Sequence, residues 1–297
     1  MNQLSKKKSI LLGLGTFVIV VLSLIFIGSP LQVNFGMVGL LLTEVMFLII
    51  ACGGVLLTKG SFKEVFPIKK PALRQTIGTL ILWVASYLLV LFSTIVCAYF
   101  FPESFANVST SITEFFTVVP FWAQFLIIAV SPAICEEVIH RGFILHQLKS
   151  LEKKWLIVLI MGILFGIFHL DPMRFLGTAI LGAIITYVAI ETNNMFYPFL
   201  IHLVNNSLSV IATKMTEGTE VTAQTSEVTI PLSVVGIYMI FLCVSPWLLW
   251  LGINLLHPKK EKAEGKKLAA WQKVVLCSVT SGICIIGGFL ITVIGVA

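Results

Sequence analysis

Residues 121–142 read FWAQFLIIAVSPAICEEVIHRG. The first fifteen positions are apolar except for Gln124 and Ser131, and two adjacent carboxylates, Glu136 and Glu137, follow in a segment long enough to cross a bilayer. An ionised carboxylate in hydrocarbon is costly, so acids inside membrane spans usually face a bundle interior or a watery cavity. The stretch therefore predicts a membrane helix whose polar side chains point into the protein.

The composition of the whole chain supports this interpretation. Of 297 residues, 58% are hydrophobic and 11% are charged, against about 25% charged residues in soluble proteins. We predict an all-α, polytopic transmembrane helix bundle in contact with the lipid bilayer. The net charge of +6 does not indicate a nucleic-acid partner, because the Lys and Arg residues lie in short loops between apolar runs, where they set orientation.

Apolar windows of about 20 residues predict nine spans, with eight as the alternative. They are 9–29, 37–58, 76–100, 120–147, 155–170, 174–191, 196–213, 231–256 and 274–296. The fifth to seventh are short and closely spaced, which suits tilted, broken or re-entrant segments beside a protein cavity. The first is too long for a secretory signal and precedes no small-x-small cleavage pattern, so we expect it to stay uncleaved.

Basic residues predict the orientation of these spans. The clusters fall on one side of the arrangement: Lys6–Lys8; Lys59, Lys63, Lys69, Lys70 and Arg74; Lys149, Lys153 and Lys154; Lys259, Lys260, Lys262, Lys266, Lys267 and Lys273. The opposite loops are acidic or neutral and contain Glu103, Glu114, Glu217, Glu220 and Glu227. The positive-inside rule places the N-terminus in the cytoplasm and the C-terminus outside. Segment 61–75 is interpreted as a basic loop, with a short interfacial amphipathic stretch as the alternative.

The six cysteines show no metal-ligand or redox spacing. All of them fall within predicted spans, where we expect small buried residues. Cys135, next to Glu136, is an alternative nucleophile, but consecutive helical residues point about 100° apart.

The fourth span combines an expected ion pair with a free acid. Glu137 and Arg141 are four residues apart and pair along one helical face, with the acid N-terminal to the cation. Glu136 then faces another direction. Pro132 predicts a kink beside Glu136, and Ser131 is expected to cap the half-helix that follows.

Two other spans carry polar groups of a matching kind. His169 ends the fifth span, whereas His202 and Asn206 are four residues apart and share one face of the seventh. Asn205 is expected to point elsewhere. At about 1.5 Å per residue, Glu136, His169 and His202 lie roughly 20, 21 and 12 Å from the predicted cytoplasmic ends, so they can share one depth.

This set of side chains suits hydrolysis. Glu136 would take a proton from water with the help of His169, while His202 and Asn206 would donate hydrogen bonds to an oxyanion. That chemistry needs no cofactor, and we prefer it. The metal content is unknown from the sequence, because Glu136, His169 and His202 are also a suitable ligand set for zinc, with one position left for water. His140, four residues after Glu136, is the rival to His169.

Three motifs lie in order on separate apolar segments: Glu136-Glu137-x-x-x-Arg141, Phe165-x-x-x-His169 and His202-x-x-x-Asn206. Together they resemble the motifs of the CPBP intramembrane protease family, which includes type II CAAX prenyl endopeptidases and the bacterial Abi and bacteriocin-immunity proteins. The resemblance covers about residues 121–210.

The resemblance implies an intramembrane endopeptidase. Glu136 and His169 would activate water, and His202 and Asn206 would stabilise the oxyanion. Glu137, Arg141 and Phe165 would support them structurally. The family is often described as metalloproteases, whereas we favour a glutamate-dependent reaction without metal.

The expected organisation has three parts. Residues 1–119 hold N-terminal spans and a basic cytoplasmic loop, 120–213 hold the catalytic core, and 214–297 hold C-terminal spans with a second basic loop. The expected substrate is a membrane-associated peptide or protein, lipid-modified in the CAAX case, and the expected location is the bacterial plasma membrane. The alternatives are a non-catalytic membrane scaffold or bacteriocin-immunity protein, and a transporter with a proton relay, whose paired broken helices the sequence does not show.

Overall fold

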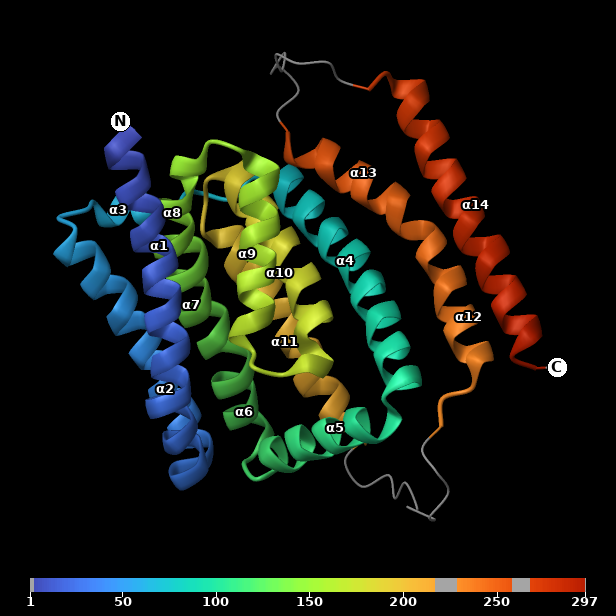
Figure 1. Cartoon of the computed structure of the whole chain (residues 1–297), viewed down its shortest axis with the longest axis horizontal. Coiled ribbons are helices and arrows are strands. Elements are labelled where there is room, and N and C mark those ends of the chain that lie inside the picture. The colour runs from blue at the N-terminus through green and yellow to red at the C-terminus, as the bar shows by residue number, and fades with distance from the viewer. Residues whose placement is uncertain (1–2, 217–228, 258–267, 297) are drawn as a thin grey trace.

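The computed structural model describes residues 3–216, 229–257 and 268–296 (Figure 1). These residues form helices and contain no strand, which confirms the all-α prediction. The chain begins with α1 (Gln3–Ser23), the π-helical segment η1 (Leu24–Gly28), α2 (Ser29–Leu57), α3 (Phe62–Val65), α4 (Leu73–Phe100) and α5 (Pro102–Thr117). The middle of the chain contains α6 (Phe121–Gln124), η2 (Phe125–Val130), α7 (Ser131–Glu137), η3 (Val138–Ile144), α8 (Leu145–Leu148) and η4 (Lys149–Leu151). It continues with α9 (Lys154–Phe168), α10 (Pro172–Thr192) and α11 (Phe196–Thr216), and the last part holds α12 (Leu232–Phe241), η5 (Leu242–Val244), α13 (Ser245–Leu256) and α14 (Ala270–Ile294).

Several helices of the described chain suit a membrane. Six segments are long and apolar enough to cross one: Ser5–Leu57, Leu73–Phe100, Phe121–Leu151, Pro172–Thr192, Leu232–Leu256 and Ala270–Ile294. The shorter helix α9 is apolar as well. The ranges predicted as spans fall largely on helices. The count of nine crossings, the cytoplasmic N-terminus and the three-part division remain predictions.

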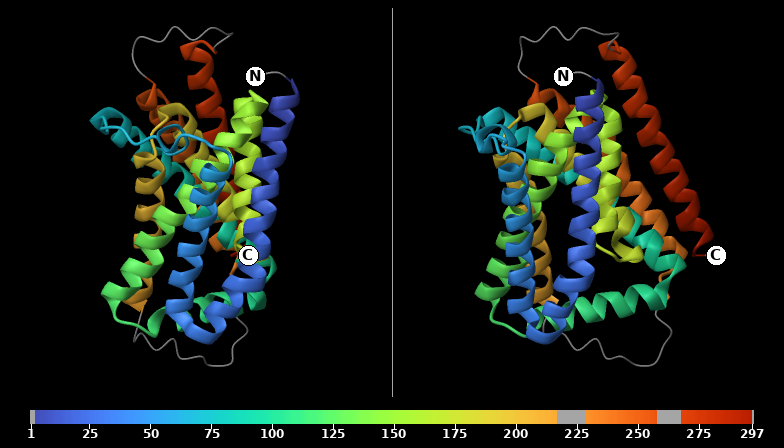
Figure 2. Two further views of the ribbon diagram at one scale, coloured as in Figure 1. Left: turned by 90° about the vertical axis from the view of Figure 1, so that its left-hand side faces the viewer. Right: turned by 60° about the vertical axis from the view of Figure 1, so that its left-hand side comes forward.

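The first of these segments folds back on itself. Its 53 residues form a helical hairpin, in which α1 descends and α2 returns beside it (Figure 2). Gly36 has a φ of +53°, a conformation that glycine adopts without the steric cost of a Cβ. Gly39 lies so close to the preceding turn that a Cβ there would be 1.9 Å from the carbonyl oxygen of Leu31. The hairpin therefore depends on glycine at both positions.

We expect Gly39→Ala to lower the free energy of unfolding by about 1–3 kcal/mol, because the obstructing atom belongs to the backbone and cannot rotate away. Thermal unfolding of the purified protein in detergent measures the effect. Gly53→Ala is the matched control in the same helix, since a Cβ at Gly53 would meet nothing within 4 Å. Equal melting temperatures for the two variants would contradict the prediction.

The basic clusters in the described part of the chain gather at one end of the bundle. The N-terminus, α3 and α8 lie together at the upper end of Figure 1. Lys6 on α1 bonds to Glu152 at 2.5 Å and so joins two of the clusters. The positions from Lys259 to Lys267, and Glu217, Glu220 and Glu227, lie outside the described residues.

The opposite end differs from the prediction in one respect. Residues 102–117, which carry Glu103 and Glu114, form helix α5 rather than a loop. This helix lies across the lower end of the bundle (Figure 1). Pro102 in its first turn favours helix initiation, because the missing N–H would have no helical acceptor there.

The connector before α4 is ordered by contacts with the start of α11. Its only helix is the single turn α3. The Pro67 carbonyl accepts a hydrogen bond from the Met195 N–H at 2.7 Å, and the Asn194 side chain bonds to both the N–H and the carbonyl of Lys69 at 3.0 Å. The connector thus has the form of a loop, in agreement with the preferred interpretation of segment 61–75.

The segment Phe121–Leu151 forms the centre of the bundle. In its most apolar window 61% of the residues are buried, against at most 39% in the other five candidate spans. α2 packs against α7 and η3, and α11 packs against α7 and η2, while α10 joins α9, α4 and α11. The segment that carries the two central carboxylates is therefore the one best shielded from lipid.

Candidate active site

Helix α7 lies between two π-helical segments, η2 and η3. Such wide turns occur frequently at functional sites. The chain passes through Pro132 without leaving the helical conformation, and the Ser131 side chain does not cap this turn. The predicted Ser131 cap is therefore wrong, because a cap requires an N-terminus and the preceding residues are already helical.

Pro132 explains one contact of Asn206. The carbonyl of Ile128, four residues before Pro132, loses its usual donor because proline has no N–H. Asn206 Nδ2 donates to this carbonyl at 3.0 Å. One amide hydrogen of Asn206 thus ties α11 to the central segment, and the second remains for another acceptor.

Glu137 is the acceptor at the centre of a buried polar cluster. Its Oε1 accepts hydrogen bonds from Arg141 Nη1 at 2.8 Å and from His202 Nδ1 at 2.7 Å. Arg141 also donates to the Gly182 carbonyl at 3.0 Å, and its guanidinium lies 4.3 Å from the Phe165 ring centroid. The predicted ion pair of Glu137 and Arg141 is confirmed. The hydrogen bond from His202 gives Glu137 a second function, which the sequence did not indicate: Glu137 orients the His202 imidazole.

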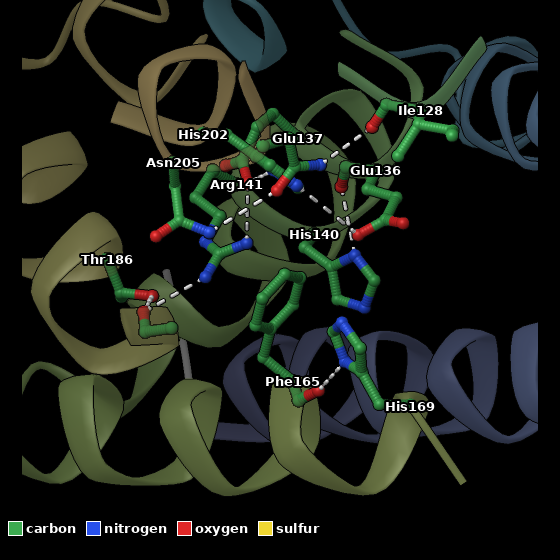
Figure 3. Close-up of polar contacts among 12 residues, drawn as sticks. Ile128, Glu136, Glu137, His140, Arg141, Phe165, His169, Thr186, His202 and Asn205 are labelled. Atoms are coloured by element: carbon green, nitrogen blue, oxygen red, sulfur yellow. Dashed lines mark hydrogen bonds and ion pairs between the residues drawn. The ribbon is translucent and has the colours of Figure 1, made fainter. Parts of the chain in front are cut away.

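His202 lies between the two central carboxylates. Its Nε2 is 3.9 Å from Oε2 of Glu136 (Figure 3). With Nδ1 donating to Glu137, Nε2 accepts hydrogen bonds in the neutral ring and donates them in the imidazolium. The carboxylate of Glu137 behind the imidazole holds the ring in place.

Phe165 separates the imidazoles of the site. The side chain is 1% exposed, and its ring centroid lies 5.2 Å from that of His140, 4.9 Å from that of His169 and 5.9 Å from that of His202. The Phe165 carbonyl accepts a hydrogen bond from His169 Nδ1 at 2.8 Å, which leaves Nε2 of His169 available. His140 Nδ1 is bonded at 2.9 Å to the main-chain carbonyl of Glu136, not to its carboxylate.

A cavity of about 440 Å³ brings the predicted catalytic residues together. Glu136 from α7, His169 from the end of α9, and His202 and Asn206 from α11 all line it. His140 is not among the described residues that line the cavity, which favours His169 over this rival.

The same cavity is also lined by polar residues that were not predicted to reach it. Asn205 lines it and donates to Asn206 Oδ1 at 3.3 Å, so the expectation that Asn205 points elsewhere is wrong. Arg174 also lines it. Asp171, three residues earlier, caps α10 by accepting the Met173 N–H at 2.8 Å.

Glu44 of α2 is the most informative addition. It lines the cavity with Glu136 and is 2% exposed. It is the one charged residue between Lys8 and Lys59. An isolated acid in an apolar span is the signal that singled out Glu136, and the same signal identifies Glu44.

The donor atoms do not have the arrangement of a zinc site. Among the described residues, no three His, Cys, Asp or Glu side chains are grouped so that they could hold a metal ion. No grouping of the described residues therefore supports the zinc alternative, which needs ligands arranged tetrahedrally at about 2.0–2.3 Å.

One family model matches the part of the chain that contains Glu136, His169, His202 and Asn206. Residues 118–208 match the family model described as type II CAAX prenyl endopeptidase Rce1-like, which confirms the resemblance to the CPBP family. At the family level, the match indicates an intramembrane peptidase that acts on a peptide or protein substrate. No curated protein and no solved structure matches the chain.

Proposed function

We propose that this chain, whose residues 118–208 form an Rce1-like domain, cleaves a peptide bond of a membrane-associated peptide or protein through water activated by Glu136 and His169. The observation that carries the proposal is the shared cavity lined by Glu136, His169, His202 and Asn206. A prenylated C-terminal peptide is the first substrate class to test, since the matched family is named for it.

Glu136 acts as the general base. It takes a proton from water while the water oxygen bonds to the carbonyl carbon, and it returns this proton to the leaving amine as the C–N bond breaks. His169, held by the Phe165 carbonyl through Nδ1, orients the water through Nε2. The proton that Glu136 takes from water is the one that the leaving amine receives, so no second residue has to act as a general acid.

His202 and Asn206 stabilise the oxyanion that forms during the attack. His202 donates from Nε2 as an imidazolium braced by Glu137, and Asn206 donates the amide hydrogen that Ile128 does not use. Donors that are already oriented before the reaction are effective because they need no reorganisation when the charge develops.

The proposed location is a bacterial plasma membrane, with the basic end of the bundle toward the cytoplasm. The gathering of the described Lys and Arg clusters at one end supports this orientation. No contact among the described residues favours the alternative role as a non-catalytic scaffold or bacteriocin-immunity protein.

A comparison of protein termini tests the proposed function. Bacterial cells would express the wild type or Glu136→Gln at equal levels, and the N- and C-termini of their membrane proteins would be compared by mass spectrometry. We expect new termini only with the wild type, and these termini identify the substrate. Identical termini in both strains, under conditions where the wild type has a phenotype, would contradict proteolysis and favour the binding role.

Removal of divalent metals is expected to leave the cleavage rate unchanged, because the cavity residues do not form a metal site. The purified protein would be treated with EDTA and with 1,10-phenanthroline, and a zinc metalloprotease treated in parallel would serve as the control. Loss of activity that added zinc restores would show that the proposed metal-free reaction is wrong.

A further inference from the structure

Glu44 enters the site from a helix outside the matched domain. It lies near the middle of α2, which packs against α7, so its carboxyl group reaches the cavity that holds Glu136. The family match begins at residue 118. Glu44 is therefore part of the site by geometry and belongs to none of the three motifs.

Two carboxylate oxygens in this cavity have no hydrogen-bond partner among the described residues. Oε2 of Glu44 and Oε2 of Glu136 are both buried, and neither accepts a hydrogen bond from any described residue. Within the described chain, Glu44 also forms no ion pair that would explain its burial. Since buried acceptors without donors are unfavourable, a donor held between the two groups is expected.

The surroundings of Glu44 suit water. A second cavity, of about 230 Å³, is also lined by Glu44, Glu136 and His169, so the three side chains lie where two cavities adjoin. Gln32 and Thr43 contribute further polar atoms to the second cavity. A water molecule needs a polar site with two to four partners and takes up about 30 Å³ in the liquid, so these cavities are large enough to hold it.

We propose that Glu44 is a further catalytic residue, which together with Glu136 holds the water that attacks the peptide bond. One O–H of this water donates to Glu136 and the second is shared, as a three-centre hydrogen bond, between Glu44 and Nε2 of His169, which leaves a lone pair of the oxygen directed at the substrate carbonyl carbon. Glu136 accepts one proton as the C–O bond forms and returns it to the amine as the C–N bond breaks. Glu44 keeps its hydrogen bond to the second O–H throughout. The inference rests on the proposed peptidase function.

Glu44→Gln is expected to lower kcat by about 100-fold with KM unchanged, because a mispositioned water reduces the rate of attack but not the binding of the peptide. The probe is an internally quenched farnesylated peptide that ends in a CAAX sequence. Glu191→Gln is the matched control, since Glu191 pairs with Lys154 at 2.6 Å and lines neither cavity. Melting temperatures of all variants in detergent would verify that Glu44→Gln is folded.

Infrared spectroscopy provides a second readout that needs no substrate. A water shared by two carboxyl groups couples their stretching bands, so Glu44→Gln should shift the band that disappears in Glu136→Gln. The O–H stretching band of the shared water, identified by its shift in H₂¹⁸O, should be lost in both variants. Independent bands would overturn the proposal.

The two measurements also separate this inference from the proposed function. A folded Glu44→Gln variant with wild-type kcat, beside an inactive Glu136→Gln variant, would overturn the role of Glu44 and leave the peptidase intact. If the wild type cleaves no peptide, the peptidase proposal fails. The infrared bands then still show whether Glu44 and Glu136 share a water.

Discussion

Glu136→Gln is expected to lower kcat by about 10²–10⁴-fold, the range associated with loss of a general base. Glutamine preserves the volume of the side chain and one acceptor oxygen, but it does not take a proton from water at neutral pH. The contact with His202 Nε2 at 3.9 Å is too long for a hydrogen bond, so the substitution breaks no strong interaction of the carboxylate. We therefore expect a folded and inactive protein.

Cleavage of the farnesylated CAAX peptide, measured beside thermal unfolding, tests this expectation. Glu136→Asp is an informative companion, because it keeps the base and withdraws it by one methylene, so it should retain more activity than Glu136→Gln. A Glu136→Gln variant with the wild-type rate would show that the base lies elsewhere, and His140 would then be the next residue to replace.

Arg141→Met is expected to lower the free energy of unfolding by about 3–5 kcal/mol, the usual cost of removing one partner of a buried ion pair. The side chains of Arg141 and Glu137 are both fully buried. Methionine fills much of the volume, but Glu137 would be left with His202 as its one donor, and the Gly182 carbonyl would lose its hydrogen bond from Nη2. Thermal unfolding in detergent measures the loss.

The double variant Glu137→Gln/Arg141→Met separates stability from catalysis. Because it leaves no single buried charge, we expect it to recover part of the lost stability. Its kcat should remain low, since His202 no longer has a carboxylate behind Nδ1. A double variant as unstable as Arg141→Met would contradict the ion-pair explanation. Full activity in the double variant would contradict the role of Glu137 in orienting His202.

The helical fold could be predicted from the sequence because its cause is local. Inside a bilayer every main-chain N–H and C=O must be satisfied within its own segment, so long apolar runs become helices. The four-residue spacings are local as well. They correctly predicted the pair of Glu137 and Arg141, and they placed His202 and Asn206 on one face of α11.

Predictions failed where neighbours outside the segment decide the outcome. Ser131 was expected to cap a half-helix after a kink at Pro132, but the π-helical turns and a hydrogen bond from Asn206 to Ile128 accommodate Pro132 within helical backbone, so there is no N-terminus to cap. The stretch 102–117 was expected to be a loop because it lies between two predicted spans. It forms a helix that packs against α2 and α4.

The sequence by itself thus determined the helical class, the family resemblance and the set of residues proposed to activate water. Only the tertiary structure decided which of them face one cavity. It favoured His169 over His140, turned Asn205 and Arg174 toward the cavity, and brought Glu44 of α2 beside Glu136, ninety-two positions later in the chain. The physical reason is that helix formation follows from hydrogen bonds four residues apart, whereas the meeting of side chains on different helices depends on how those helices pack.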